Sequence, residues 1–211
     1  NIDKFSNLVK LGLGNSSIMF LMGAMGLSAA MTESGLARRF MLWMLTKVGR
    51  RTDRIVLAFI TVGALTSMWV TDMAVAAMLL PLGMSILQGS GCKPLESNFG
   101  RALMIGIVWG SLIGGTATPA GCGANVLAMQ YVRDIAQLDV SFAQWMAVGV
   151  PGALLMIPLG WFCLMKLFKP EFKEIPITLD SIKAELAALG GLKVKEIRTL
   201  VVFVTMVFLW L

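Results

Sequence analysis

The chain consists of long apolar blocks that alternate with short polar or charged segments. The main apolar blocks cover residues 15–31, 55–87, 102–131 and 143–168. An α-helix needs roughly 20 mostly apolar residues to cross the hydrocarbon core of a bilayer, whereas shorter runs are typical of soluble cores. The pattern therefore predicts an all-α polytopic membrane protein with its charged segments at the membrane surfaces.

The block 55–87 carries an acid in its middle, Asp72, within the stretch SMWVTDMAVAAMLLP. Basic residues flank the block on both sides, which is typical of segments that begin and end at the cytoplasmic surface. About 33 residues are too few for two full crossings. The pattern thus favours a re-entrant helical hairpin over 55–87 with its tip at 70–73. The alternative is one long tilted helix that is kinked before Pro81.

A second polar break interrupts the next block. Over residues 101–133 the chain reads ALMIGIVWGSLI, then GGTATPAGCGAN at 114–125, then VLAMQYV. Glycine raises the entropy cost of a helix and proline removes a hydrogen-bond donor, so this composition unwinds a helix. We therefore expect a discontinuous transmembrane helix over 101–133. Such a break exposes carbonyl and N–H groups to whatever occupies the gap.

These features divide the chain into three parts. Residues 1–54 form a scaffold-type span followed by a basic amphipathic helix, which we expect along the cytoplasmic interface. Residues 55–137 hold the hairpin and the broken helix, and we interpret them as part of a transport domain. Residues 138–211 hold a spanning helix, a cytoplasmic interfacial helix and the start of a further span.

Within the last part, the segment 132–142 has no positive excess and is predicted to be a loop on the outer side. A full span then covers 143–168, and Leu, Ile and Ala at helical spacing predict the interfacial helix over 178–189. The final run is apolar up to Leu211 but too short to cross a bilayer. We therefore expect the chain to be a fragment that is cut within a transmembrane helix.

Composition narrows the classes of function. Of 211 residues, 57% are hydrophobic and 14% are charged, whereas about 25% are charged in soluble domains. The net charge of +6 comes from clustered Lys and Arg, as in cytoplasmic loops. The absence of histidine argues against a Cys/His zinc site, and no Ser or Cys is paired with a base for covalent catalysis. We expect membrane lipid as a partner, no nucleic acid, no cofactor and no enzymatic activity; the three cysteines are expected to be free thiols.

The two polar breaks suggest a secondary transporter. Discontinuous helices in paired positions are the best sequence pointer to the ion and substrate sites of such proteins. Thr hydroxyls, an Asn amide, an Asp carboxylate and free carbonyls are hard oxygen ligands that suit Na⁺. Positive helix N-termini suit an anionic substrate.

Two motifs resemble those of the divalent anion/sodium symporters, a family of the ion transporter superfamily. SMWVTDMAVAAMLLP resembles the hairpin of that family, and GGTATPAGCGANVL resembles its second signature. The flanking ESGLARR and SFAQWMAVGVP are also similar, so the resemblance covers essentially the whole chain as the N-terminal half of a member. It implies one half of an inverted-repeat transporter, with the C-terminal half missing, in a homodimer of a multi-pass protein in the bacterial inner membrane.

The resemblance also implies a function and a set of site residues. The function is symport of a small divalent anion (a dicarboxylate, a citrate-like anion or sulfate) with Na⁺ or H⁺, by an elevator-type movement. Sodium would be held through Asp72 and Asn125. The cation-binding residues implied are Thr71, Asp72, Gly115, Thr116 and Asn125. The substrate-binding residues implied are Thr71, Met73, Thr118, Gly121, Cys122 and Asn125.

The chain departs from the family pattern at the tip of the hairpin. Where the family has Asn and Thr, this chain has Asp72 and Met73, and the Thr-Pro-Pro of the second signature is replaced by residues 122–124. An ionised acid deep in a membrane is costly unless it is paired or faces water. We hypothesise that Asp72 is a cation-coupling ligand that binds Na⁺ or cycles a proton. The alternative is a structural acid paired with an Arg or Lys of the missing half.

Two other functions are compatible with the sequence. One is a cation/proton antiporter or arsenite-type exporter of the same superfamily, in which the acid exchanges protons. The other is a membrane assembly partner or receptor that binds without transport. Cation uptake depends on the anion in the symporter but not in the antiporter. Both transporters show flux, whereas the receptor binds without it.

Overall fold

The computed structural model describes residues 16–93, 96–175 and 180–210. All regular elements within these ranges are α-helices, which confirms the predicted all-α class. Three of them, α5, α6 and α8, are long and apolar enough to cross a membrane. The helices are α2 (Ser16–Ser34), α3 (Leu36–Leu45), α4 (Thr52–Ser67), α5 (Asp72–Gly89), α6 (Asn98–Ala117), α7 (Gly123–Ala136), α8 (Phe142–Leu167), α9 (Asp180–Ala188) and α10 (Val194–Trp210).

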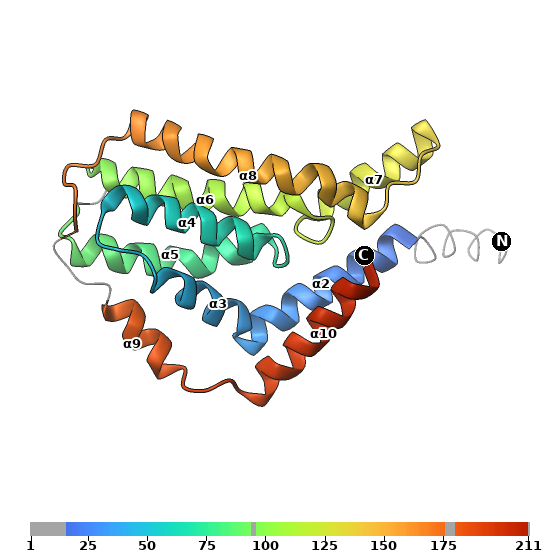
Figure 1. The fold of residues 1–211 in the computed structure, drawn as a ribbon, viewed down its shortest axis with the longest axis horizontal. Coiled ribbons are helices and arrows are strands. Elements are labelled where there is room, and N and C mark those ends of the chain that lie inside the picture. The colour runs from blue at the N-terminus through green and yellow to red at the C-terminus, as the bar shows by residue number, and fades with distance from the viewer. Residues whose placement is uncertain (1–15, 94–95, 176–179, 211) are drawn as a thin grey trace, which may run out of the picture.

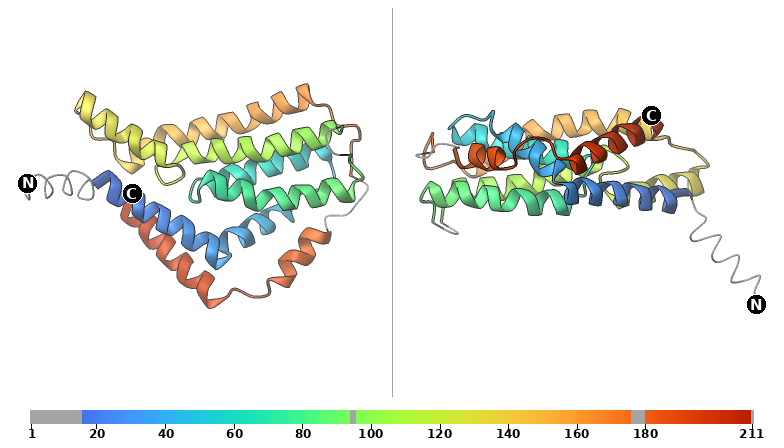
Figure 2. Two further views of the ribbon diagram at one scale, coloured as in Figure 1. Left: turned by 180° about the vertical axis from the view of Figure 1, so that it is seen from behind. Right: turned by 90° about the horizontal axis from the view of Figure 1, so that it is seen from below.

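The helices form two groups. Helices α4, α5, α6 and α8 run side by side along the long axis of the molecule, as Figures 1 and 2 show. Helix α10 lies beside α2, and α9 packs on α3, which joins α2 to the first group. The main cluster of buried apolar side chains is shared by α3, α4, α5 and α6 and reaches α8.

The predicted hairpin is present as two antiparallel helices, α4 and α5, joined by residues 68–71 (Figure 1). The junction begins two residues before the predicted tip, and the chain is not one continuous helix kinked before Pro81. That proline lies inside α5 instead. Helix α5 is by itself long and apolar enough to cross a membrane completely. The re-entrant course of the hairpin, in which each arm reaches only part of the way, therefore stays a prediction.

Glycines bring α4 and α6 into backbone contact. Gly106, Gly110 and Gly114 recur at every fourth residue of α6, so they lie on one face of the helix. A Cβ atom on Gly114 would collide with the backbone of Ala64, and one on Gly110 with the backbone of Ile60. Small residues of this kind allow close helix packing in membrane proteins. The contact fixes the end of α6 against the end of α4, where the hairpin turns.

The broken helix is present, but its interruption is shorter than predicted. Helix α6 continues through the glycines to Ala117, and α7 begins at Gly123 after the loop 118–122. Packing against α4 holds the last turn of α6 helical despite its glycines. The prediction of a loop over 132–142 was wrong in part, because α7 continues to Ala136 and its polar end projects beyond the packed helices (Figure 1).

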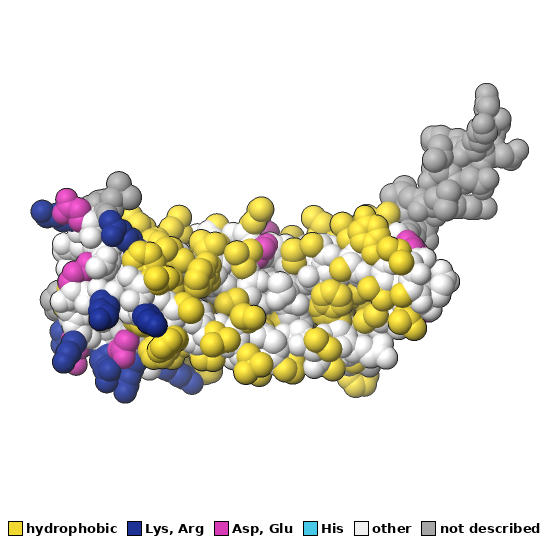
Figure 3. All heavy atoms as spheres, turned by 90° about the horizontal axis from the view of Figure 1, so that it is seen from above, with side chains coloured by type: hydrophobic (Ala, Val, Ile, Leu, Met, Phe, Trp, Pro, Cys, Tyr) yellow, Lys and Arg dark blue, Asp and Glu magenta, His cyan; other side chains and the backbone are white. Residues whose placement is uncertain are grey.

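Basic side chains gather at one end of the molecule, and hydrophobic side chains cover most of the rest of the visible face (Figure 3). The beginnings of α4 and α6 and the ends of α5 and α8 lie at this end (Figure 1). Both flanks of the hairpin therefore share the same basic end. The segment after α8 is attached there, because the Thr52 N–H group donates to the carbonyl of Lys173 at 3.0 Å.

Two further contacts tie the groups together. The guanidinium of Arg39 in α3 makes a bidentate ion pair with the buried Glu196 of α10, with an Nε–Oε1 distance of 2.9 Å. The same guanidinium donates to three carbonyls between α9 and α10. In addition, Trp69 in the hairpin turn packs edge-on against Phe203 of α10, with 5.1 Å between ring centroids.

Candidate functional site

The turn of the hairpin and the loop of the broken helix contact each other directly. The Thr118 hydroxyl donates to the carbonyl of Met68 in the turn and accepts the Gly121 N–H at 3.2 Å. A Cβ atom on Gly121 would lie 2.7 Å from the carbonyl oxygens of both Gly115 and Ser67. Only glycine fits this close approach, which brings the loop backbone against the ends of α4 and α6.

Asp72 is the first residue of α5 and lies beside this contact. Its Oδ1 accepts the N–H of Met73 at 2.9 Å. A Cβ atom placed on Gly115 would be 3.6 Å from the Asp72 Cβ, so the acid is next to the last turn of α6. None of the ion pairs within residues 16–93, 96–175 and 180–210 includes Asp72. The helix dipole favours an acid at this position, but no basic side chain of the described part neutralises it.

Asn125 closes the break between α6 and α7. It lies in the first turn of α7 with 7% of its surface exposed. Its Nδ2 donates to the carbonyls of Gly115 and Thr118, both at 2.7 Å. These bonds satisfy carbonyls left over at the end of α6. They also use both amide hydrogens, while the Oδ1 atom makes no hydrogen bond to another described residue.

Ser67 is a residue of the site that the sequence analysis did not single out. Its side chain is fully buried, and its hydroxyl has no hydrogen-bond partner in the structure. A Cβ atom on Gly115 would lie 3.4 Å from this hydroxyl oxygen, so Ser67 and Asp72 meet at the same point of α6. A buried hydroxyl without a partner is costly, which suggests that something else satisfies it. The only sequence signal was its position in the polar turn motif.

Helix α2 also reaches the turn. The N–H group of Thr71 donates to the hydroxyl oxygen of Ser28 at 3.0 Å, and Ser28 is buried. This bond satisfies an N–H group at the start of α5 that has no partner within the helix. The start of α5 is thus positioned both by α2 and by the loop of the broken helix.

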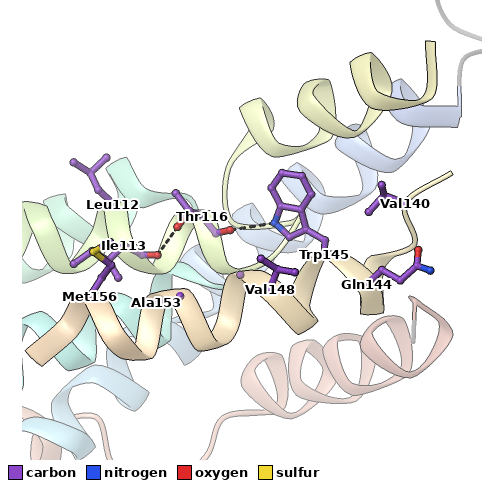
Figure 4. Close-up of a pocket in the computed structure, with 11 residues that line it drawn as sticks. Leu112, Ile113, Thr116, Val140, Gln144, Trp145, Val148, Ala153 and Met156 are labelled. Carbon is purple, nitrogen blue, oxygen red and sulfur yellow. Dashed lines mark hydrogen bonds between the residues drawn. The ribbon is translucent and has the colours of Figure 1, made fainter. Parts of the chain in front are cut away.

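Thr116 lies apart from the other predicted cation ligands. Its hydroxyl donates to the carbonyl of Ile113 at 2.9 Å, and its own carbonyl accepts from the Trp145 indole at 3.1 Å. Both residues line a groove between α6 and α8 with a volume of about 660 Å³ (Figure 4). The groove is mostly apolar and has no charged side chain in its lining, so it suits neither a sodium ion nor an anionic substrate. We leave the Thr116 hydroxyl out of the candidate cation site.

The predicted substrate-binding residues differ in how accessible they are. Met73 is the most open, with 83% of its surface exposed, and Cys122 is half-buried directly before α7. Thr118 is fully buried and bonded to the turn. In this conformation it positions the loop and cannot reach a substrate.

The oxygen atoms gathered here suit an alkali cation. They come from a carboxylate (Asp72), a hydroxyl (Ser67), an amide (Asn125) and nearby backbone carbonyls. Hard oxygen donors at the ends of interrupted helices are the usual surroundings of Na⁺ in transporters. Within the described residues, no three His, Cys, Asp or Glu side chains are grouped as a transition metal would require. All three cysteines are free, as predicted.

Comparison with known proteins identifies similar sequences over nearly the whole chain. The family model "Sodium:sulfate symporter transmembrane region" matches residues 4–211. The sodium-dependent dicarboxylate transporter SdcS of Staphylococcus saprophyticus is 30% identical over 206 residues, and that of Staphylococcus aureus is 28% identical over 207 residues. Each alignment covers 94% of this chain but 40% of the relative. The chain therefore spans about two fifths of the length of these bacterial relatives.

Proposed function

The chain belongs to the sodium:sulfate symporter family, and from that premise we propose that the full-length protein is a secondary transporter that couples movement of a small anion to Na⁺. The family and both relatives are transporters and not enzymes. The matched family and the apolar helices place the chain in the cell membrane as a multi-pass protein.

The observation that carries the proposal is the set of unsatisfied oxygen atoms where the hairpin meets the loop. The carboxylate of Asp72 has no ion pair within the described residues, and the buried hydroxyl of Ser67 has no partner. Both residues adjoin Gly115, where an added Cβ atom would lie 3.6 Å from the Asp72 Cβ and 3.4 Å from the Ser67 hydroxyl oxygen. A single Na⁺ between them would neutralise the first and coordinate the second. The Oδ1 of Asn125 and carbonyls of the loop supply further ligands. Cation binding would then hold the hairpin and the broken helix together.

The anion would bind next to the cation. Helices α5 and α7 begin at the contact and run away from it in opposite directions (Figure 1). A helix N-terminus has N–H groups without partners inside the helix and a partial positive charge, which favour an anion. A bound cation adds a full positive charge to this region. Coupling follows because each ion makes the binding of the other more favourable.

Further features of the proposal come from the family. The α4–α5 hairpin would be re-entrant, with its turn inside the membrane. An inverted second half would supply another cation site and the rest of the anion pocket. The protein would act as a homodimer in which the hairpin and the broken helix move by an elevator-type mechanism. The share of the relatives that this chain covers supports a second half.

The experiment is uptake into proteoliposomes that contain the full-length protein. Labelled succinate is tested first, because the relatives are named as dicarboxylate transporters, and citrate and sulfate follow. Imposed Na⁺ and H⁺ gradients are compared in the wild type and in Asp72→Asn. Asp134→Asn, which removes an exposed acid near the end of α7, is the matched control.

We expect uptake that is driven by the cation gradient, a changed cation dependence in Asp72→Asn and no change in Asp134→Asn. Absence of gradient-driven uptake of all three anions would contradict the proposal. The antiporter is the second candidate, because Asp72 has no ion-pair partner among the described residues and such an acid can exchange a proton. Exchange of Na⁺ for H⁺ without any anion would favour it.

A further inference from the structure

The carboxylate of Asp72 lies at the N-terminus of α5, which is one of the two helix N-termini that would attract an anion. The N–H group of Met73 points out of the start of α5 and is already used by the Asp72 Oδ1 at 2.9 Å. An anion that approached α5 would therefore meet an acid instead of a free donor. Of the two helix N-termini at the contact, only that of α7 begins without an acid in its first turn.

The negative charge of Asp72 also cancels the positive charge of one bound cation. No described basic side chain is paired with it, and the visible Lys and Arg side chains gather at the far end of the molecule (Figure 3). A Na⁺ bound by Asp72 and Ser67 leaves this region neutral, not positive. Like charges placed side by side are strongly disfavoured at a binding site, so in this half of the binding site the second charge of a dianion would face the acid uncompensated.

The neighbouring side chain favours the same conclusion. Met73 follows Asp72 in the first turn of α5, and 83% of its surface is accessible. Its thioether is a weak acceptor with no donor for a carboxylate. Its methylene groups suit the uncharged part of an organic substrate. The turn thus presents an acid and an apolar side chain where a second carboxylate would need donors.

We infer that Asp72 sets the charge of the substrate, so that the site takes organic anions with a single negative charge in preference to dianions. This inference rests on the proposed function and deepens it. In this role Asp72 acts twice, as a ligand of the coupling cation and as a selector against the second charge of the anion.

The test compares two probes that share a carbon skeleton. Succinate carries two carboxylates, and succinamate, its monoamide, carries one. Uptake efficiency (Vmax/KM) of each labelled probe is measured in proteoliposomes of the full-length protein at neutral pH under an inward Na⁺ gradient. The proteins are the wild type, Asp72→Asn and the control Asp134→Asn.

We expect the wild type to prefer succinamate by about tenfold or more, the size of effect that a like charge in a binding site produces. Asp72→Asn should reverse or abolish that preference, and Asp134→Asn should keep it. A wild type that prefers succinate would overturn the inference while leaving the proposed function intact, as would a preference that Asp72→Asn does not change. If the Na⁺ gradient drives uptake of neither probe, the proposed function fails and the inference with it.

Discussion

At the scale of single residues, Ser67 and Asp72 are polar groups that the described protein does not satisfy. The hydroxyl is buried without a hydrogen bond, and the carboxylate has one hydrogen bond and no ion pair. An ionised acid inside a membrane is costly unless it is paired or faces water. Such groups are retained when a ligand completes their surroundings, and a cation would serve both.

Ser67→Ala tests this argument, because it separates stability from cation binding. The hydroxyl makes no hydrogen bond in the structure, so its removal should leave the apparent unfolding temperature in detergent unchanged or slightly raised. The Na⁺ concentration for half-maximal uptake should rise about tenfold, the effect of losing one contact to a charged group.

Ser111→Ala is the matched control for that prediction. Ser111 is also buried, but its hydroxyl donates to the carbonyl of Ile107 at 3.0 Å within α6. Its replacement should leave the Na⁺ dependence unchanged. Equal effects of the two replacements on the Na⁺ dependence would remove Ser67 from the cation site.

The sequence indicated most of the residues at the contact but not how each is used. Asp72, Gly115, Thr118, Gly121 and Asn125 were predicted from the two motifs, and the structure brings them together. Ser67 was missed because a serine in an apolar helix usually bonds to its own backbone, and only the structure shows its hydroxyl without a partner. Thr116 stays an untested prediction: each step along a helix turns the side chain by about 100°, so this neighbour of Gly115 lies in the groove beside α8.

At the scale of helices, the close approach of α4 and α6 should be sensitive to single methyl groups. Gly114→Ala would place a Cβ atom against the backbone of Ala64, which cannot move aside as a side chain can. We expect destabilisation by about 1–3 kcal/mol, as for other overpacked cores, and a loss of Na⁺-dependent uptake. The measurement is thermal unfolding of the purified protein together with the uptake assay.

Gly152→Ala in α8 is its control. Nothing lies within 4 Å of the place that a Cβ atom would take on Gly152. Alanine should stabilise the helix there by about 0.5–1 kcal/mol. If Gly114→Ala and Gly152→Ala destabilise the protein equally, a clash with the backbone of Ala64 does not explain the effect at Gly114, and the packing argument is wrong.

The stability that the start of α6 gives to the fold should depend on pH through Glu171, which lies in the segment after α8. Burial raises the pKa of this carboxyl, but hydrogen bonds from its own N–H, from the N–H groups of Asn98 and Phe99 and from the Ser97 hydroxyl lower it, so that the pKa lies below the ordinary value. A lowered pKa in the folded state means that the ionised carboxylate stabilises the fold at neutral pH.

This stabilisation should be complete above the ordinary Glu pKa of about 4.3 and lost as the pH falls through the lower folded value. Because the carboxylate is exposed, the loss is that of a helix cap, at most about 1 kcal/mol. Unfolding temperatures of the wild type and Glu171→Gln should therefore differ at neutral pH and converge in acid. A difference that persists in acid would contradict the assignment.

The order of the helices was predictable from the apolar blocks, but their ends were not. The hairpin and the broken helix follow from length limits and from the glycine-rich stretch. The true turn at 68–71 depends on contacts with α2 and with the loop 118–122, which lie far away in the sequence. The extension of α7 to Ala136 replaced a predicted loop, because charged residues at the end of a helix resemble a loop in sequence.

At the scale of the whole molecule, Arg39 holds α10 and the end of α9 against α3. The exposed fractions of the Arg39 and Glu196 side chains are 15% and 2%, so loss of the arginine would leave a buried acid unpaired. Arg39→Met should destabilise the protein by about 3–5 kcal/mol. The measurement is the apparent unfolding temperature in detergent.

The neighbouring Arg38 offers a matched comparison. It forms an ion pair with Glu185, but its side chain is 55% exposed. Such surface pairs contribute about 0–1 kcal/mol, so Arg38→Met should have little effect. Similar losses from both replacements would show that burial of Glu196 does not decide the stability of this corner.

The membrane class and the family could be predicted from the sequence, because the apolar blocks indicate the class and the two motifs indicate the family. The grouping of α2 with α10 could not, since no periodicity links segments so far apart. The chain spans about two fifths of the length of its relatives, and the proposal assigns the rest of the anion pocket to protein beyond these residues.

We propose that the hairpin turn and the loop of the broken helix share one cation site. The most direct test of this claim is equilibrium binding of ²²Na⁺ to the purified full-length protein, in the wild type, Ser67→Ala, Asp72→Asn and the control Ser111→Ala. We predict saturable binding that weakens in the first two variants and is unchanged in Ser111→Ala. Sodium binding that is the same in all four proteins would contradict the claim.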